Sequence, residues 1–208
     1  RTLLIKLLNI RFNNALKNTS KNTSLEAFLG AALDNDHWLL VVPLTKGLLP
    51  FQQLRLKASE LAKIKLPCAH IVLVENEQCH YQLPELQDTI AILGAGLNLN
   101  WLNNPHFKSS HIAYWGDIDS WGLKMLSTAR NLQPDLTALL MDSETFENNQ
   151  HLAVVEPQTA GNETPQHLNI AEADLYQKLL QLEKGRLEQE FIDKTMVQDV
   201  IKNWHKMA

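Results

Sequence analysis

The chain has 208 residues, of which 45% are hydrophobic and 20% charged, which is enough to bury a core. A net charge of -4 and a pI near 6.1 exclude a protein that binds nucleic acid through a global basic field. Any DNA contact would need a local patch, a metal ion or a segment outside this sequence.

The first stretch, RTLLIKLLNIRF, is interrupted by Lys6 and Arg11 and has no small-residue cleavage site, so it predicts a helix rather than a signal peptide. No run reaches the roughly 18 apolar residues of a membrane span, and we expect a cytoplasmic protein without membrane contact. The chain begins with Arg1 rather than methionine, which suggests a fragment. Cys68 and Cys79 lack CxxC spacing and the histidines lack HxxxH or HExxH spacing, so neither a disulfide nor a zinc site is expected.

The N-terminal part predicts helices followed by a strand. Residues 2–34 are expected to be helical, with leucines 3, 4, 7 and 8 on one face and Ser24 capping a second short helix. HWLLVVPL, residues 37–44, predicts a strand. KASELAKIK, residues 57–65, predicts a helix that ends before Pro67.

Four short apolar runs then predict buried parallel strands, because they are aliphatic and β-branched throughout instead of alternating. They span residues 70–76, 89–96, 111–117 and 136–142, and a helix from Asp119 to about Asn131 provides one crossover. The predicted fold class is α/β, with a four-stranded, mainly parallel sheet flanked by helices.

The C-terminal part predicts a loop and two helices. Residues 156–169 contain two prolines and a glycine, which indicates a loop or linker. Asn169 and Glu172 resemble a capping box for a helix that Gly185 stops. The last helix carries an apolar stripe made of Val197, Val200, Ile201 and Trp204. We therefore expect a helical remnant of an upstream domain (1–36), an α/β core (37–156), and a loop with C-terminal helices that pack on the core (157–208).

Acidic residues follow the predicted strands. Glu75 closes the first run, and Asp117 closes the third with Asp119 just beyond it. Because the carboxyl ends of parallel strands share one sheet edge, these three carboxylates are expected to converge. Two carboxylates about 4 Å apart repel by about 4 kcal/mol at an effective dielectric near 20, so a cation, donor or proton must compensate them. Carboxylates are the ligands that Mg²⁺ prefers, which makes Glu75, Asp117 and Asp119 the candidate metal and catalytic residues.

Each acid also has a purely structural interpretation. Asp119 could cap the helix that begins near Ser120 while Asp117 accepts loop hydrogen bonds, and Glu75 could bond to turn amides. For Asp142 and Glu144 a helix cap is as good an explanation as metal contact.

Other residues are ambiguous in the same way. Gly94 and Gly96 could admit a phosphate or simply form a strand-to-helix turn. Trp115 and Trp121 could stack on bases, but core packing is favoured, and Tyr114 lies in a buried run, which is unfavourable for a nucleophile. A phosphate-facing stripe or a solvated helix face would equally explain the cluster of Arg55, Lys57, Lys63 and Lys65.

The order of strand-Glu, glycine-containing strand, strand-DxD and strand resembles the Toprim domain. The motifs VENE (74–77), ILGAG (92–96), YWGDIDSWG (114–122), LLMD (139–142) and RLEQE (186–190) are similar to the C-terminal domain of the Wadjet nuclease family JetD. That family resembles the A subunit of type VI topoisomerase, and the resemblance covers roughly residues 35–208.

This resemblance implies a Toprim-like core preceded by a winged-helix domain. It also implies a homodimer that cleaves double-stranded DNA with Mg²⁺ or Mn²⁺ and is recruited by an SMC-like complex of the other Wadjet subunits. Glu75 matches the Toprim glutamate, and Asp117 and Asp119 match the DxD pair. The expected reaction is phosphodiester hydrolysis, in which the two aspartates hold a metal ion and Glu75 shares a metal or accepts the proton of the attacking water.

Two other functions fit the same residues. In a HAD-like phosphatase Asp117 would be the nucleophile, but that fold places its DxD on the first core strand, and here a strand with its own acid precedes it. A Toprim-shaped module that binds DNA or protein without turnover is the second alternative.

Overall fold

The computed structural model describes residues 2–12, 25–31, 36–96 and 98–207, and the chain divides into two compact units, residues 1–37 and 38–208. The first unit contains the helices α1 (Thr2–Arg11) and α2 (Leu25–Leu29). The predicted cap Ser24 lies outside the described residues. The expected division into three parts stays a prediction.

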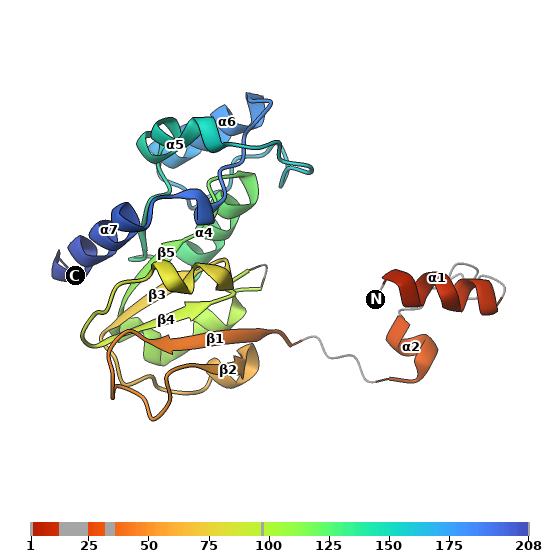
Figure 1. The fold of residues 1–208 in the computed structure, drawn as a ribbon, viewed down its shortest axis with the longest axis horizontal. Coiled ribbons are helices and arrows are strands. Elements are labelled where there is room, and N and C mark those ends of the chain that lie inside the picture. Colours follow the sequence, from red (N-terminus) through yellow and green to blue (C-terminus); the bar gives the residue numbers. More distant parts are fainter. Residues whose placement is uncertain (1, 13–24, 32–35, 97, 208) are drawn as a thin grey trace. The chain divides into compact units, whose positions relative to one another are not determined.

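The second unit is built on one six-stranded sheet with the order β2-β1-β4-β3-β5-β6 (Figure 1). The strands β4, β3, β5 and β6 run parallel to one another, whereas β1 is antiparallel to both β4 and β2. The α/β class is confirmed, but the expected four strands are wrong because the sheet has six. The strands are β1 (Trp38–Pro43), β2 (Leu54–Lys57), β3 (His70–Val74), β4 (Thr89–Leu93), β5 (His111–Trp115) and β6 (Thr137–Ala138).

Two element predictions are corrected. The helix expected over 57–65 is limited to α3 (Ala58–Leu61), and Lys57 belongs instead to the edge strand β2, which LRLK forms. Charged side chains on an edge strand discourage pairing with another chain. The strand expected over 136–142 pairs only at β6, and Leu140 has φ +57°, a left-handed conformation that ends the extended backbone.

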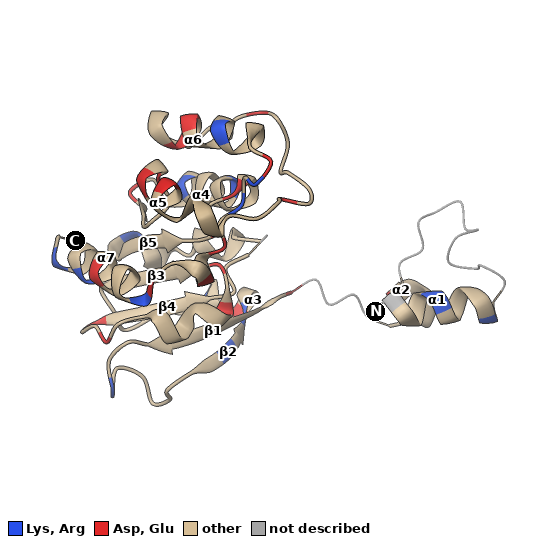
Figure 2. Cartoon of the chain, turned by 45° about the horizontal axis from the view of Figure 1, so that its top comes forward, with Lys and Arg blue, Asp and Glu red and all other residues tan. Residues whose placement is uncertain are grey.

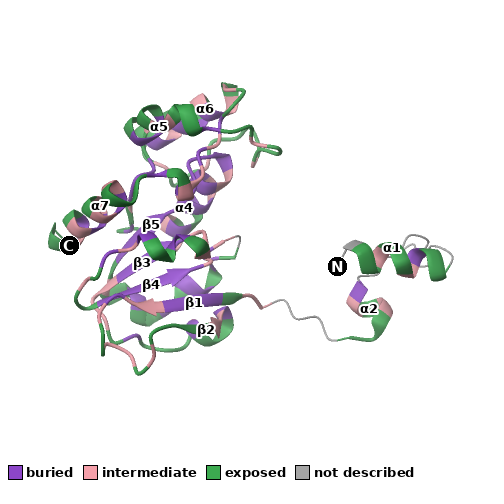
Figure 3. Cartoon of the chain, viewed as in Figure 1, coloured by how far each residue is buried: buried purple, intermediate pink, exposed green. Residues whose placement is uncertain are grey.

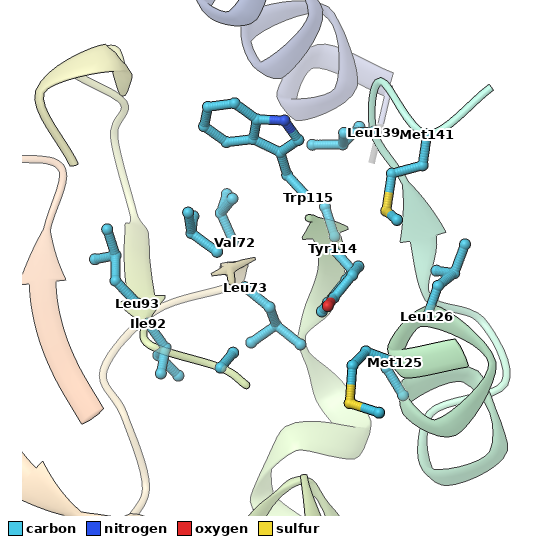
Figure 4. Close-up of a cluster of buried hydrophobic side chains, with 14 of the residues drawn as sticks. Val72, Leu73, Ile92, Leu93, Tyr114, Trp115, Met125, Leu126, Leu139 and Met141 are labelled. Carbon is cyan, nitrogen blue, oxygen red and sulfur yellow. The ribbon is translucent and has the colours of Figure 1, made fainter. Parts of the chain in front are cut away.

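The central strands are covered on both faces, which is why their sequences do not alternate. Buried residues fill the strands and the inner sides of the flanking helices (Figure 3). Tyr114 points toward Met125 of helix α4 (Ser120–Leu132), while Val72 and Trp115 point to the opposite face (Figure 4). The crossover helix predicted from Asp119 onward is confirmed.

The remaining helices are α5 (Ser143–Asn149), α6 (Ile170–Gln181) and α7 (Lys194–Met207). The capping box of Asn169 and Glu172 is confirmed, and α7 buries most of its predicted stripe. In the described part of the chain, no helix is long and apolar enough to cross a membrane. Short 3₁₀ turns occupy Glu77–Gln82, Asn100–Asn103, Pro105–Ser109, Gln150–Leu152 and Gln189–Phe191.

The segment 156–169 is irregular, as predicted, but it is tied to the helices beneath it. The indole nitrogen of Trp121 donates to the carbonyl of Gln158 at 2.8 Å, and the hydroxyl of Tyr176 donates to the carbonyl of Gly161 at 2.7 Å. These bonds make the segment a surface loop that contacts α4 and α6 rather than a linker between separate bodies.

Candidate functional site

The register of two parallel strands brings the predicted acids together. Val74 of β3 pairs with Trp115 of β5, and the amide of Glu75 donates to the carbonyl of Trp115 at 3.1 Å. Glu75 therefore lies beside the turn that carries Asp117 and Asp119. The amide of Asp117 donates to Oε2 of Glu75 at 3.3 Å, a direct contact across 42 positions of sequence.

Glu75 lies among groups that disfavour its charge. Burial, and then the charges of Asp117 and Asp119, raise the pKa of Glu75 to about 8. The hydroxyl of Tyr114 donates to Oε2 of Glu75 at 3.3 Å, which opposes the shift only weakly. Tyr114 itself is fully enclosed and its pKa is raised by burial, so it supports the glutamate instead of serving as an accessible nucleophile.

Asp117 is buried and uses both carboxylate oxygens. Its Oδ1 accepts the amide of Gln189 at 2.9 Å, and its Oδ2 accepts Nη2 of Arg186 at 3.0 Å. The interpretation in which Asp117 accepts hydrogen bonds from a loop is thus correct for Oδ1.

Asp119 is also buried and is the N-cap of α4, because its Oδ1 accepts the amide of Gly122 at 2.7 Å. Its Oδ2 lies 3.3 Å from Nε of Arg186. Burial raises the pKa of Asp119 to about 6, and the charges of Glu156 and Asp117 add to the effect. We call Glu75, Asp117 and Asp119 the acid cluster. Asp119 can cap α4 and also belong to this cluster, since each role uses a different oxygen.

Arg186 supplies the compensating cation in this structure. Its backbone forms two hydrogen bonds with Val154, at 2.8 and 3.1 Å, and its guanidinium contacts Asp117, Asp119 and Glu188. Burial lowers the pKa of Arg186, but the hydrogen bond and charge of Asp117 outweigh this effect and the net pKa is raised.

Residues around the acid cluster that the sequence analysis missed come from two distant segments. Glu156 accepts a hydrogen bond from the hydroxyl of Ser120 at 2.5 Å at the start of α4. Arg186, Glu188 and Gln189 lie in the segment after α6. Arg186, Glu188 and Gln189 belong to the motif RLEQE, whose composition is typical of a solvent-exposed charged segment. The only sequence signal for their role in the site was therefore the similarity of RLEQE to the family motif.

The two acids after the fourth predicted strand are not in the cluster. Asp142 is exposed and caps α5, because its Oδ1 accepts the amide of Thr145 at 2.7 Å. Glu144 lies in the first turn of the same helix. The helix-cap interpretation of Asp142 is confirmed.

The remaining candidates have structural roles. Gly94 has φ +78° and begins the turn after β4, while Trp115 is fully buried in the core. Of the four basic residues for which a phosphate-facing stripe and a solvated helix face were equal explanations, Arg55 and Lys57 lie on β2, where Arg55 pairs with Glu77, and Lys63 and Lys65 follow α3, so they do not share one helix face. Basic residues occur on β2, α4, α6 and α7 instead of in one stripe (Figure 2).

Whether the acid cluster can hold a metal ion depends on Arg186, because its guanidinium contacts both aspartates. Among the described residues, no group of three His, Cys, Asp or Glu side chains is arranged to hold a metal ion. The donor chemistry nevertheless fits a divalent ion, because Oδ2 of Asp117 and Oδ2 of Asp119 both face one cation and Glu75 contacts the same turn. That cation is at present the guanidinium.

The fold and the cluster define a class: an α/β protein with an acidic site at the carboxyl edge of parallel strands, where such sheets bind ligands. Residues 29–201 match the family described as Wadjet protein JetD, C-terminal. The match covers well over half of the chain, so the chain belongs to this family and the resemblance seen in its motifs is confirmed. A comparison with curated proteins gave no match.

Proposed function

We propose that the chain is the nuclease domain of a Wadjet defence protein and hydrolyses phosphodiester bonds of plasmid DNA with Mg²⁺ or Mn²⁺. Membership of the Wadjet family supports the defence role and a complex with other Wadjet subunits. The single observation that carries the chemistry is the contact of Glu75 with the turn of Asp117 and Asp119 at one sheet edge. In this proposal β3 to β6 form a Toprim-like core, double-stranded DNA is the substrate and the active form is a homodimer.

The proposed roles follow from the contacts. Asp117 and Asp119 would hold the ion through their Oδ2 atoms, because backbone amides already bind both Oδ1 atoms. Glu75 would share the ion or accept the proton of the attacking water. When bound, the metal would stabilise the charge that develops on the phosphate and lower the pKa of its water. Tyr114 orients Glu75 through its hydroxyl.

The test is metal-dependent cleavage of plasmid DNA by the purified protein with its Wadjet partner subunits. We expect Glu75→Gln or Asp117→Asn to lower the cleavage rate by about 100-fold or more, the usual effect of removing one preorganised electrostatic contact. Asp142→Asn is the matched control, since it also converts a carboxylate into an amide but lies on the α5 cap. Near-normal cutting by either of the first two variants would refute the assignment.

The ion pairs of Arg186 favour a second candidate, a binding module without turnover. An arginine that already neutralises Asp117 and Asp119 can stabilise the fold without any metal. Mn²⁺ binding without DNA cleavage in the complete complex would support this alternative. A HAD-like phosphatase is not favoured, because that fold places its DxD on the first core strand, whereas Asp117 follows the strands β3 and β4 in the chain.

A further inference from the structure

Arg186 occupies the two oxygens that a metal ion would need. Its Nη2 lies 3.0 Å from Oδ2 of Asp117, and its Nε lies 3.3 Å from Oδ2 of Asp119. The other oxygen of each aspartate accepts a backbone amide, from Gln189 and Gly122 respectively. The two carboxylates are therefore held in place by the main chain and would keep their positions if the guanidinium left.

We propose that Arg186 is the resident counter-cation of the acid cluster and that metal binding displaces its guanidinium from Asp117 and Asp119 onto Glu188. This inference rests on the proposed metal-dependent function and adds a residue that controls entry of the ion. A divalent ion on the same two oxygens would lie close to the guanidinium, and like charges at contact distance repel strongly. Ion and guanidinium therefore compete for one position.

The structure contains the acceptor for the displaced side chain. Oε1 of Glu188 is 3.2 Å from the same Nη2 atom that contacts Asp117, so the guanidinium already pairs with Glu188 and can keep this partner when it rotates away from the aspartates. The Arg186 side chain is 31% exposed and the Glu188 side chain 29%, which leaves room for the movement on the solvent side.

The backbone around Arg186 is held by hydrogen bonds and has little freedom to move with the displaced side chain. Arg186 exchanges two hydrogen bonds with Val154, and Leu187 exchanges two with Ile118, at 2.9 and 3.1 Å. Ile118 lies between the two aspartates. The segment that carries the arginine is thus paired directly with the turn that carries the acids, and only the side chain can exchange partners.

The first test measures Mn²⁺ affinity of the full chain by electron paramagnetic resonance of the unbound ion. We expect Arg186→Gln to bind Mn²⁺ about tenfold more tightly or better, within the usual range of coupling between two ligands. Arg130→Gln is the control, because Arg130 forms a comparable ion pair with Glu172 and should leave the affinity unchanged. Unchanged or weaker binding by Arg186→Gln would overturn the proposal.

Glu188 is tested by a double-mutant cycle. Glu188→Gln should weaken Mn²⁺ binding when Arg186 is present, because the displaced guanidinium then lacks its acceptor. In the Arg186→Gln background the same substitution should have a smaller effect. Equal effects in both backgrounds would show that Glu188 acts only through its general negative charge, and the acceptor role would be wrong.

A measurement on the unmodified chain covers the case in which Arg186→Gln does not fold. The side-chain Nε–H resonance of Arg186, assigned by its loss in Arg186→Lys, should shift when Mg²⁺ is added, whereas that of Arg130 should not. An unshifted Arg186 signal in a chain that binds Mg²⁺ would contradict displacement.

The outcomes separate this inference from the proposed function. Metal-dependent DNA cleavage with no effect of Arg186→Gln on Mn²⁺ affinity overturns the inference alone. Tighter Mn²⁺ binding by Arg186→Gln without DNA cleavage by the complete complex supports the inference and overturns the nuclease function. A chain that binds no Mn²⁺ with or without Arg186 overturns both.

Discussion

At the scale of single residues, the pKa of Glu75 depends on its burial and on the charges of Asp117 and Asp119. Arg186 contacts both aspartates, but no contact of Arg186 with Glu75 is among the interactions of the described residues. Glu75 is therefore the acid whose pKa burial and its like-charged neighbours raise to about 8, from an ordinary value of 4.5. A carboxylate with this environment is stabilised by a bound cation or by a proton.

This shift predicts a pH dependence for the metal-free protein. Because the folded state binds the Glu75 proton more tightly than the unfolded chain, the stabilisation is complete below pH 4.5 and is lost as the pH rises toward 8. In EDTA, Glu75→Gln should therefore raise the Tm relative to the unmodified chain at pH 9, by about 2–4 °C or more, and change it little at pH 4.5.

The control for this measurement is Glu144→Gln, which removes an exposed acid in the first turn of α5. Its Tm should follow that of the unmodified chain at both pH values. A Glu75→Gln variant whose Tm advantage is the same at pH 4.5 and pH 9 would show that the carboxyl group does not titrate between them.

At the scale of elements, the turn between β5 and α4 positions the acids through two glycines. A Cβ added at Gly122 would lie 2.0 Å from the carbonyl oxygen of Asp117, and one at Gly116 would lie 2.6 Å from Oε2 of Glu75. The first clash is with backbone and the second with the end of a side chain. The glycines of YWGDIDSWG are therefore required by close packing around the acids.

These contacts predict a ranking of three alanine substitutions in thermal or denaturant unfolding. Gly122→Ala should cost the most, about 3 kcal/mol, because the backbone of the turn must shift, and Gly116→Ala should cost about 1 kcal/mol by displacing Glu75. Gly96→Ala is the control: its Cβ would meet nothing closer than 4.0 Å, so a change within about 0.5 kcal/mol is expected. A Gly122→Ala variant as stable as Gly96→Ala would contradict the close approach of Gly122 to the backbone of Asp117.

At the scale of the whole molecule, the core determines what can fold independently. All members of the buried hydrophobic cluster among the described residues lie between Leu39 and Trp204. They come from the sheet, the helices on its faces and the C-terminal helix α7. The core of the second unit thus needs its last helix.

A fragment of residues 38–208 should therefore unfold cooperatively, with a Tm within about 4 °C of the full chain, because it retains the entire cluster. A fragment of residues 38–193 lacks α7 with the buried Val197, Ile201 and Trp204, and should lose the cooperative transition. Calorimetry distinguishes the two fragments. If 38–208 lacks a transition while the full chain shows one, the core of the second unit is not self-sufficient.

The sequence alone was sufficient for the α/β class, the central strands and the convergence of Glu75 with Asp117 and Asp119. Each of these depends on local signals: unbroken aliphatic runs, acids at the ends of three of the four runs, and the rule that parallel strands align their carboxyl ends. The capping box of α6 and the apolar stripe of α7 are equally local, because helix caps and helical periodicity span only a few residues.

Only the tertiary structure decided that the sheet has six strands and that Arg186 neutralises the acids. The edge strand LRLK alternates apolar and basic residues but is only four residues long, too short to be a clear signal, and it is stabilised by pairing with β1. Arg186 meets Asp117 across 69 positions of sequence, through a bridge between the loop after α6 and the turn after β5. Charge pairing falls off with distance in space and not along the chain, so a run such as RLEQE carries no local sign of the partner it will meet.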